Sequence, residues 1–209
     1  MPAVTTEVVL AGEDAGLSKW LGDHGIRCRT LTAAGEASNR EVILVSKTPP
    51  TPAAIEEIWR RVERGATAIF LSPDVLKKGD QPFGWLPLAN KGSGSYLDMW
   101  GGLYLKDEWA KRHPIFDGLP SGGLMDYTFY REIIPGLVLA GQDQPAEAVA
   151  GAIKASQDYS SGLMLAVYKS GSGRFILNTL LIRENLGTHP AAERLLRNLL
   201  NYGNSPPRQ

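Results

Sequence analysis

The sequence has very little cysteine and histidine, and this scarcity limits its chemistry. Cys28 is the single cysteine among 209 residues, so no disulfide can form within the chain. It alternates with Ile26 and Thr30 on one face of an expected strand, where a buried thiol serves as inert packing. The histidines are scattered and show no metal-ligand spacing with the cysteine. We therefore expect no metal site.

An excess of one charge and long apolar runs are also missing. The 22 basic residues equal the 22 acidic residues, so no overall field attracts nucleic acid or an anionic membrane. No apolar run approaches the roughly 20 residues that span a bilayer. The N-terminal residues lack the basic region and apolar core of a signal peptide. We expect neither nucleic acid nor membrane as a partner, and the localisation stays open, since a module of a larger secreted protein would carry its signal elsewhere.

The clearest pattern that is present covers residues 51–74. Apolar residues recur there at helical spacing and share one face: Ile55, Ile58, Trp59 and Val62. Thr51 is a suitable N-cap and Gly65 a suitable stop. The apolar run at 66–71 then predicts a strand that is buried on both faces. We expect this strand to be central, with Trp59 buried against the sheet.

Strands alternate with helices in the first third of the sequence, which predicts a parallel sheet with right-handed crossovers. Residues 171–173 read Gly-Ser-Gly between two apolar runs, which indicates a β-hairpin near the C-terminus. The predicted fold is a three-layer α/β/α sandwich with a mostly parallel sheet and this antiparallel hairpin. Residues 1–203 form a single domain that closes with a helix at 188–202, and residues 204–209 form a disordered tail.

Residues 77–120 are predicted to be a long insertion rich in glycine and aromatic residues, with short helices near 96–100 and 106–112. Its rings either pack beneath the loop or contact a protein partner, which includes self-association. Carbohydrate is the alternative ligand, because sugars stack on Trp and Tyr while Asp and Asn bind their hydroxyls; Asn90 and Asp107 are also available. The candidate binding residues are Trp85, Tyr96, Asp98, Trp100, Tyr104 and Trp109.

The candidate catalytic residues are Ser72, His189 and Glu193. Ser72 follows the expected central strand, where a nucleophile would stand in an α/β enzyme. Pro73, however, has no backbone N–H to donate to an oxyanion hole, and the alternative role of Ser72 is a helix N-cap or turn residue. His189 precedes the closing helix, where it is either a general base that Glu193 orients or a helix cap.

Glycines after the first expected strand raise the question of a nucleotide cofactor. Gly12 and Gly16 stand where phosphate-binding glycines can occur. The segment AGEDAG, however, does not match Gly-x-Gly-x-x-Gly, and Glu13 and Asp14 would repel a phosphate. We therefore expect no cofactor.

Three stretches together resemble the class I glutamine amidotransferase-like domains, a flavodoxin-like α/β fold, of the kind associated with family 2 glycoside hydrolases of the β-galactosidase type. They are residues 42–76, 113–120 (HPIFDGLP) and 171–203. Amidotransferases of this fold use a cysteine at the elbow and a late His-Pro-Glu. This chain has Ser72 in the elbow region, and Ala191 follows His189-Pro190. The resemblance therefore implies a scaffold without the amidotransferase machinery.

The predicted function is that of a non-catalytic accessory domain related to glycoside hydrolases, which acts in domain or subunit contacts. The alternatives are a carbohydrate-active or carbohydrate-binding protein that uses the aromatic loop, and a hydrolase that uses Ser72. If the chain is part of an enzyme, the resemblance implies a glycoside hydrolase.

Overall fold

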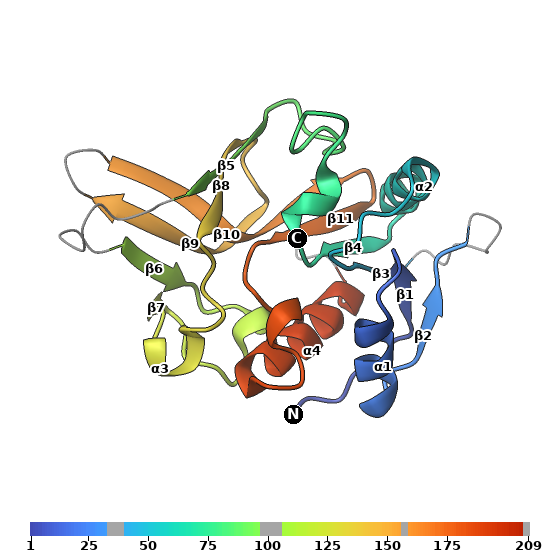
Figure 1. Ribbon diagram of the computed structural model, residues 1–209, viewed down its shortest axis with the longest axis horizontal. Helices are drawn as coiled ribbons and strands as arrows, with labels where there is room; N and C mark the ends of the chain where they lie inside the picture. The colour runs from blue at the N-terminus through green and yellow to red at the C-terminus, as the bar shows by residue number, and fades with distance from the viewer. Residues whose placement is uncertain (33–39, 97–105, 156–158, 207–209) are drawn as a thin grey trace.

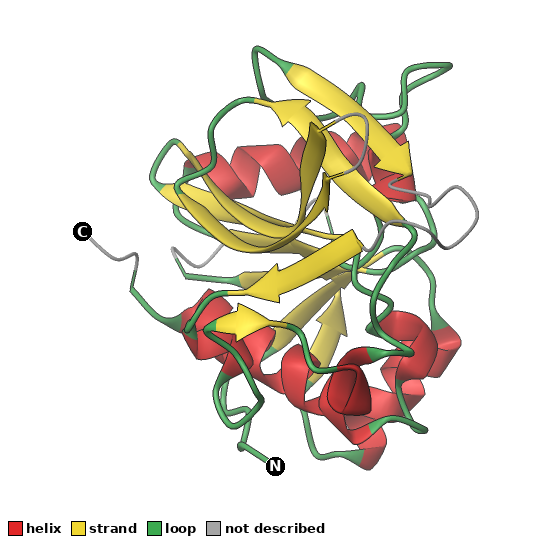
Figure 2. Cartoon of the chain, turned by 90° about the vertical axis from the view of Figure 1, so that its left-hand side faces the viewer, coloured by secondary structure: helices red, strands yellow, loops and turns green. Residues whose placement is uncertain are grey.

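The computed structural model describes residues 1–32, 40–96, 106–155 and 159–206, without the side chains of Tyr96 and Lys106. The chain is an α/β protein built on one large mixed sheet (Figure 1). Figure 2 shows helices on both sides of this sheet. The helices are α1 (Ala15–Asp23), α2 (Pro52–Glu63), α3 (Tyr127–Tyr130) and α4 (Pro190–Asn204), with short 3₁₀ turns at Pro73–Leu76, Pro114–Phe116 and Arg183–Asn185.

One part of the sheet is parallel, with the strand order β2-β1-β3-β4-β11. Its strands are β1 (Val8–Ala11), β2 (Cys28–Thr30), β3 (Val42–Val45), β4 (Thr67–Phe70) and β11 (Gly173–Asn178). Every residue of β1, β3, β4 and β11 is buried. The apolar runs that predict these strands are continuous because helices cover both faces. The strand at 66–71 is central, as predicted.

The other part of the sheet is antiparallel and continues from β11 in the order β10-β9-β6-β7. Strand β8 also pairs with β10, and β5 pairs with β8. The bounds are β5 (Lys91–Tyr96), β6 (Lys106–Ala110), β7 (Gly123–Leu124), β8 (Leu137–Gln142), β9 (Glu147–Ala155) and β10 (Tyr159–Ser170). The sequence also predicts short strands at 137–141 and 148–153, which correspond to β8 and β9, whereas β5, β6 and β7 are not expected.

The helix expected near 106–112 is wrong, because Lys106–Ala110 is strand β6 and pairs with β9. The burial of this segment alternates: Glu108 and Ala110 are buried, whereas Asp107 is exposed. Pairing with β9 places alternate residues on opposite faces, and this tertiary pattern overrides the helix propensity of Lys, Glu and Ala. The other expected helix overlaps β5 at Tyr96, and its remainder lies outside the described residues.

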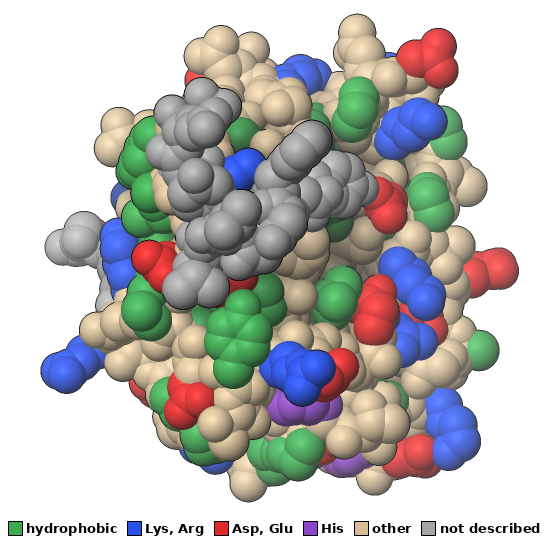
Figure 3. Space-filling model, turned by 60° about the vertical axis from the view of Figure 1, so that its left-hand side comes forward, with side chains coloured by type: hydrophobic (Ala, Val, Ile, Leu, Met, Phe, Trp, Pro, Cys, Tyr) green, Lys and Arg blue, Asp and Glu red, His purple; other side chains and the backbone are tan. Residues whose placement is uncertain are grey.

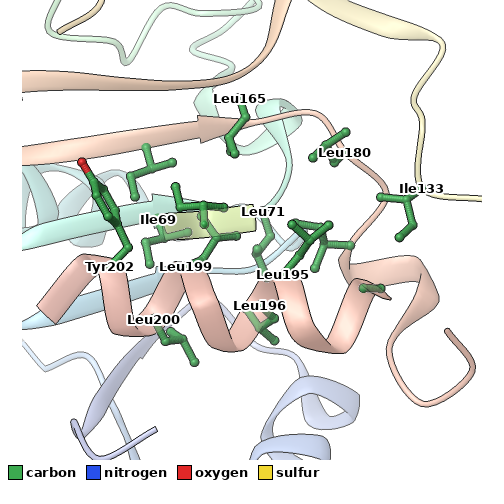
Figure 4. Close-up of a cluster of buried hydrophobic side chains, with 14 of the residues drawn as sticks. Ile69, Leu71, Ile133, Leu165, Leu180, Leu195, Leu196, Leu199, Leu200 and Tyr202 are labelled. Atoms are coloured by element: carbon green, nitrogen blue, oxygen red, sulfur yellow. The ribbon is translucent and has the colours of Figure 1, made fainter. Parts of the chain in front are cut away.

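Apolar side chains form a core on each face of the sheet. The core on the α4 side contains Ile69 and Leu165 from the strands, and helix α4 contributes Leu195, Leu199 and other leucines (Figure 4). The core on the other side lies beneath α2. Trp59 is only partly buried there, and its ring lies 5.3 Å from that of Phe70 and 5.2 Å from that of Phe175. Trp59 thus packs on the sheet, although it is not fully covered.

Helix α4 is fixed at its C-terminus by Arg174, a buried cation at the start of β11. Its guanidinium donates to the carbonyl oxygens of Tyr202 at 2.5 Å and Ser205 at 2.7 Å, and it lies 4.4 Å from the Tyr202 ring centroid. The hydroxyl of Thr67 donates to the Gly203 carbonyl at 2.8 Å. These bonds satisfy carbonyl groups that a helix end leaves without partners, and the cation complements the helix dipole.

Helix α2 is fixed to the sheet through a second buried guanidinium, that of Arg61. It donates to Glu57 Oε1 at 2.6 Å, to Glu41 Oε2 at 3.0 Å and to the Thr32 carbonyl oxygen at 2.6 Å. Burial alone would raise the pKa of Glu57, but hydrogen bonds from Arg60 and Arg61 outweigh this effect and lower it. Glu57 is therefore a carboxylate at neutral pH.

We predict that Arg61→Met lowers the free energy of unfolding by about 3–5 kcal/mol, because it leaves two buried carboxylates without their central partner. The neighbouring Arg60, whose side chain is 46% exposed, provides the control. Arg60→Met should cost no more than about 1 kcal/mol. Urea unfolding of both variants measures the difference, and equal costs would contradict a structural role for the buried network.

Candidate functional site

The carboxyl ends of the parallel strands meet at one edge of the sheet, where open α/β folds commonly bind ligands. Polar residues follow each of these ends. Asp14 lies just after β1, Ser46 follows β3, Ser72 follows β4, and Asn178 ends β11. We call these residues, together with Arg183, the carboxyl-edge cluster.

Asp14 is the centre of the carboxyl-edge cluster. Its carboxylate accepts the Leu17 N–H at 2.8 Å and thereby caps α1. Arg183 binds the same carboxylate through Nε at 2.7 Å and through a terminal nitrogen at 2.5 Å, and the Ser46 hydroxyl also donates to it. This fork ties the first βα turn to the segment between β11 and α4, which lies 169 residues further along the chain.

The glycines of this turn allow other groups to approach the backbone closely. Gly12 has a φ of +85°, and a Cβ there would lie 2.5 Å from the Thr48 carbonyl oxygen. A Cβ on Gly16 would lie 2.7 Å from a terminal nitrogen of Arg183. The N-terminus of α1, where a phosphate would bind in a nucleotide site, is therefore occupied by the carboxylate of Asp14.

The ion pair changes the pKa of both partners. The hydrogen bond from Arg183 holds the pKa of Asp14 well below its ordinary range, although burial acts in the opposite direction. The hydrogen bond to Asp14 likewise raises the pKa of Arg183. Asp14 is therefore a carboxylate at neutral pH, and it is unsuited to general acid catalysis there.

Ser72 and Asn178 lie at the end of the carboxyl edge that borders the antiparallel part of the sheet. The Ser72 hydroxyl accepts the Asp74 N–H at 3.3 Å and caps the 3₁₀ turn Pro73–Leu76. Asn178 donates to the carbonyl oxygens of Leu71 at 3.3 Å and Leu180 at 2.9 Å. A hollow of about 260 Å³ adjoins Ser72, and its walls include Asp74 and Glu184 but neither His189 nor Glu193.

His189 and Glu193 lie at the start of α4 and hold that end of the helix. Nδ1 of His189 accepts the Ala191 N–H at 3.3 Å, so His189 is the N-cap. Glu193 Oε1 accepts the Gly187 N–H at 3.2 Å and the Trp20 indole N–H at 3.4 Å. In the part of the chain that the structure describes, no hydrogen bond joins Ser72, His189 and Glu193, so they do not form a nucleophile–base pair.

The candidate binding residues of the aromatic insertion separate in space. Trp85 is partly buried, with Lys78 Nζ 4.1 Å from its ring centroid. Trp109 is partly buried on β6. Asp98, Trp100 and Tyr104 lie outside the described residues, as does the side chain of Tyr96. Among the candidate binding residues that the structure describes, Trp109 is the one that lines the hollow described next.

Two features of the antiparallel part are not predicted from the sequence. The first is a hollow of about 350 Å³ that Trp109 lines together with Tyr159 and Tyr168. The second is an exposed apolar patch formed by Leu124, Tyr127 and Phe129, whose exposed fractions are 67%, 57% and 42%. The aromatic run Tyr127–Tyr130 is a sequence signal for the patch, but the same run contains the buried Tyr130, so the sequence alone does not reveal exposure.

Among residues 1–32, 40–96, 106–155 and 159–206, no group of three or more His, Cys, Asp or Glu side chains is placed to hold a metal ion. None of the helices in these ranges is long and apolar enough to cross a membrane.

No family model matches this chain, and no curated protein matches it in sequence. Solved structures do resemble it. PurLQS from Thermotoga maritima has a TM-score of 0.53 and 13% identity over 94% of this chain and 97% of its own. The cytoplasmic protein STM3548 from Salmonella typhimurium has a TM-score of 0.51 and 12% identity over 94% of this chain and 98% of its own.

Similar structures also occur within longer chains. The exo-β-1,4-mannosidase Op5Man5 from Opitutaceae bacterium strain TAV5 has a TM-score of 0.52 and 9% identity over 97% of this chain but only 36% of its own. The β-galactosidase from Bacillus circulans sp. alkalophilus has a TM-score of 0.51 and 14% identity over 96% of this chain and 31% of its own. These likenesses link the fold loosely to PurLQS and to glycoside hydrolases.

We predict that Asp14→Asn lowers the free energy of unfolding by about 1.5–3 kcal/mol at pH 7, because it removes charge-assisted hydrogen bonds. The pKa of Asp14 is lower in the folded chain than its ordinary value of about 3.9, so this stabilisation is complete above that value and is lost as the pH falls below it. Unfolding measured from pH 7 to pH 2 should therefore show the two proteins converging in acid.

The exposed pair of Asp23 with Lys19, whose side chains are 56% and 75% exposed, supplies the control. Asp23→Asn should change stability by no more than about 1 kcal/mol. A stability difference between the parent and Asp14→Asn that persists unchanged at pH 2 would contradict the assignment of the carboxylate.

Proposed function

We propose that this chain is a three-layer α/β/α domain of the class I glutamine amidotransferase-like type, with no catalytic site of its own at the carboxyl edge. The structural roles of the residues at the carboxyl edge support this proposal. Asp14 caps α1 and binds Arg183, Ser72 caps a 3₁₀ turn, and His189 caps α4. A nucleophile needs an adjacent base, and these side chains hold backbone ends in place instead.

We further propose that the domain acts through a protein contact at the antiparallel end. The exposed apolar patch (Leu124, Tyr127 and Phe129) supports this role. Figure 3 shows hydrophobic side chains on this face, interspersed with charged ones. Contiguous exposed apolar side chains on a soluble protein mark interaction sites, and aromatic residues are favoured at their centres.

A second copy of this chain is the partner that fits the patch. Strand β7, which carries Leu124, is the edge strand at the end of the sheet, and edge strands are ready templates for association. The formal net charge of the chain is zero, so no overall repulsion opposes the approach of two copies. Because a stable interface buries about 800 Å² on each side, the patch would form its centre and polar neighbours its rim.

The likenesses to the mannosidase and the β-galactosidase, in which the matched part is about a third of the chain, support an accessory role. If this chain belongs to such an enzyme, it would contribute subunit contacts there rather than chemistry.

We predict that the chain self-associates as its concentration rises and that Leu124→Ser/Phe129→Ser abolishes this association, because the apolar centre of the contact is lost. Light scattering on eluting protein gives the mass directly. Leu181→Ser is the matched control, because Leu181 is also exposed, at 37%, but lies outside the patch. A parent protein that is monomeric at every concentration would contradict contact with a second copy.

We also predict no glutaminase activity. Pro73 follows Ser72 and lacks the N–H that an oxyanion hole would need, and Ser72 is already a cap. Ammonia release from glutamine should be the same for the parent, for Ser72→Ala and for buffer. Release by the parent that Ser72→Ala abolishes would contradict this prediction.

A further inference from the structure

The hollow of about 350 Å³ in the antiparallel part has the features of a small-ligand site. Its walls come from β6, β8, β9 and β10, and aromatic rings lie among them: Trp109, Tyr159 and Tyr168. The volume is at the lower end of the range of about 300–1,000 Å³ typical of ligand pockets. The hollow is separate from the carboxyl-edge cluster, none of whose residues lines it.

Trp109 forms one wall and lies over a glycine. A Cβ on Gly151, its partner in the β6–β9 pairing, would lie 2.6 Å from Trp109 Cζ2 and 3.0 Å from Cε2. The indole therefore covers the bare backbone of β9 and is fixed against the sheet, while the ring stays partly exposed. Lys111 Nζ lies 5.9 Å from the ring centroid, which is the outer limit of a cation–π contact. This arrangement leaves indole surface for a ligand to stack on.

Tyr168 supplies a hydroxyl group to the wall of the hollow. Its side chain is stacked on Phe175 and only 3% of the residue is exposed, yet it lines the hollow. Within the described ranges its hydroxyl makes no hydrogen bond. Burial, with the nearby Asp143 carboxylate, raises the pKa of Tyr168 to about 12, so the hydroxyl stays protonated. A protonated hydroxyl in the wall of the hollow can form a hydrogen bond with a ligand hydroxyl.

At the C-terminal end of β8, hydrogen bonds hold the side chains of Gln142 and Asp143 in fixed positions. Gln142 Nε2 donates to the carbonyl oxygens of Lys91 at 3.2 Å and Ser93 at 3.3 Å, which orients its amide oxygen. Asp143 accepts the Ala89 N–H at 2.7 Å and the Asn90 side chain at 2.8 Å. Such pre-orientation lowers the entropic cost of binding a ligand at these groups.

The charge of the hollow selects the class of ligand. Asp143 is the only charged residue among the described residues that line it, and no lysine or arginine is present there to bind a phosphate or carboxylate. Aromatic rings with hydroxyl and amide groups suit a neutral molecule that has both apolar faces and hydroxyl groups. A pyranose sugar has this combination, because its C–H groups stack on rings while its hydroxyls form hydrogen bonds.

We propose that this hollow binds a neutral pyranose sugar, which stacks on Trp109 and Tyr159 and forms hydrogen bonds with Tyr168 and Gln142. This site goes beyond the proposed protein contact and is independent of it. Sugar binding and self-association use different side chains, so either can fail without the other.

The test is titration of the intact chain with lactose, cellobiose and β-1,4-mannobiose, observed through the indole N–H signals of the tryptophans by NMR. The Trp109 signal should shift and saturate with at least one disaccharide at a Kd of about 1 mM, as for a small open site. Trp109→Ala should abolish the binding. Trp85→Ala should leave it unchanged, because Trp85 is also partly buried but lies outside the hollow.

Milder variants keep the test valid if Trp109→Ala unfolds. Tyr168→Phe should weaken binding about 2- to 10-fold, the loss expected for one hydrogen bond. Tyr159, which is 74% exposed, can change to Ser with little structural effect, and Leu181→Ser is its control, because Leu181 is 37% exposed and lies outside both the hollow and the patch. The proposal is overturned if none of the three sugars shifts the Trp109 signal, or if Tyr159→Ser and Tyr168→Phe bind as the parent does.

Discussion

The pairing of strand β11 is the constraint on which the rest of the structure depends. It is parallel to β4 on one side and antiparallel to β10 on the other, so it joins the two parts of the sheet. Buried polar residues stand at both of its ends. Arg174 binds the C-terminus of α4, and Asn178 binds the loops beyond β4 and β11. Removal of either residue would leave several buried groups without partners. Strand β11 therefore anchors both the C-terminus of α4 and the loops at the carboxyl edge.

The two parts of the sheet differ in which side chains they leave exposed to solvent. In the parallel part, the carboxyl edge is closed by the chain itself: Asp14 occupies the helix N-terminus at which an anion would bind, and Arg183 neutralises it. The antiparallel part instead leaves rings and apolar side chains open to solvent. The edge at which open α/β folds commonly bind ligands thus carries an ion pair that holds two segments of the chain together. The exposed rings and apolar side chains lie instead at the antiparallel part of the sheet.

The sequence predicts the parallel strands well but misses β5, β6 and β7 of the antiparallel part, for physical reasons. Strands buried on both faces need continuous apolar runs, such as the one at 66–71 that becomes β4. Strand β6 reads KDEWA and begins with three charged residues, so it has no apolar run, and only its pairing with β9 makes it a strand. The partnership of Asp14 with Arg183 spans 169 residues, a distance across which no local pattern operates. The caps formed by Ser72 and His189 are, by contrast, among the alternatives that local sequence suggests.

The central claim is that this protein meets its partners at the antiparallel part of its sheet and not at the carboxyl edge of its parallel strands. Hydrogen–deuterium exchange of the intact chain, with and without disaccharide and at low and high protein concentration, tests it most directly. The account predicts added protection at 107–110, 123–129 and 139–142, with exchange at 11–16, 71–74 and 178–184 unchanged. Protection confined to the carboxyl-edge segments would contradict it.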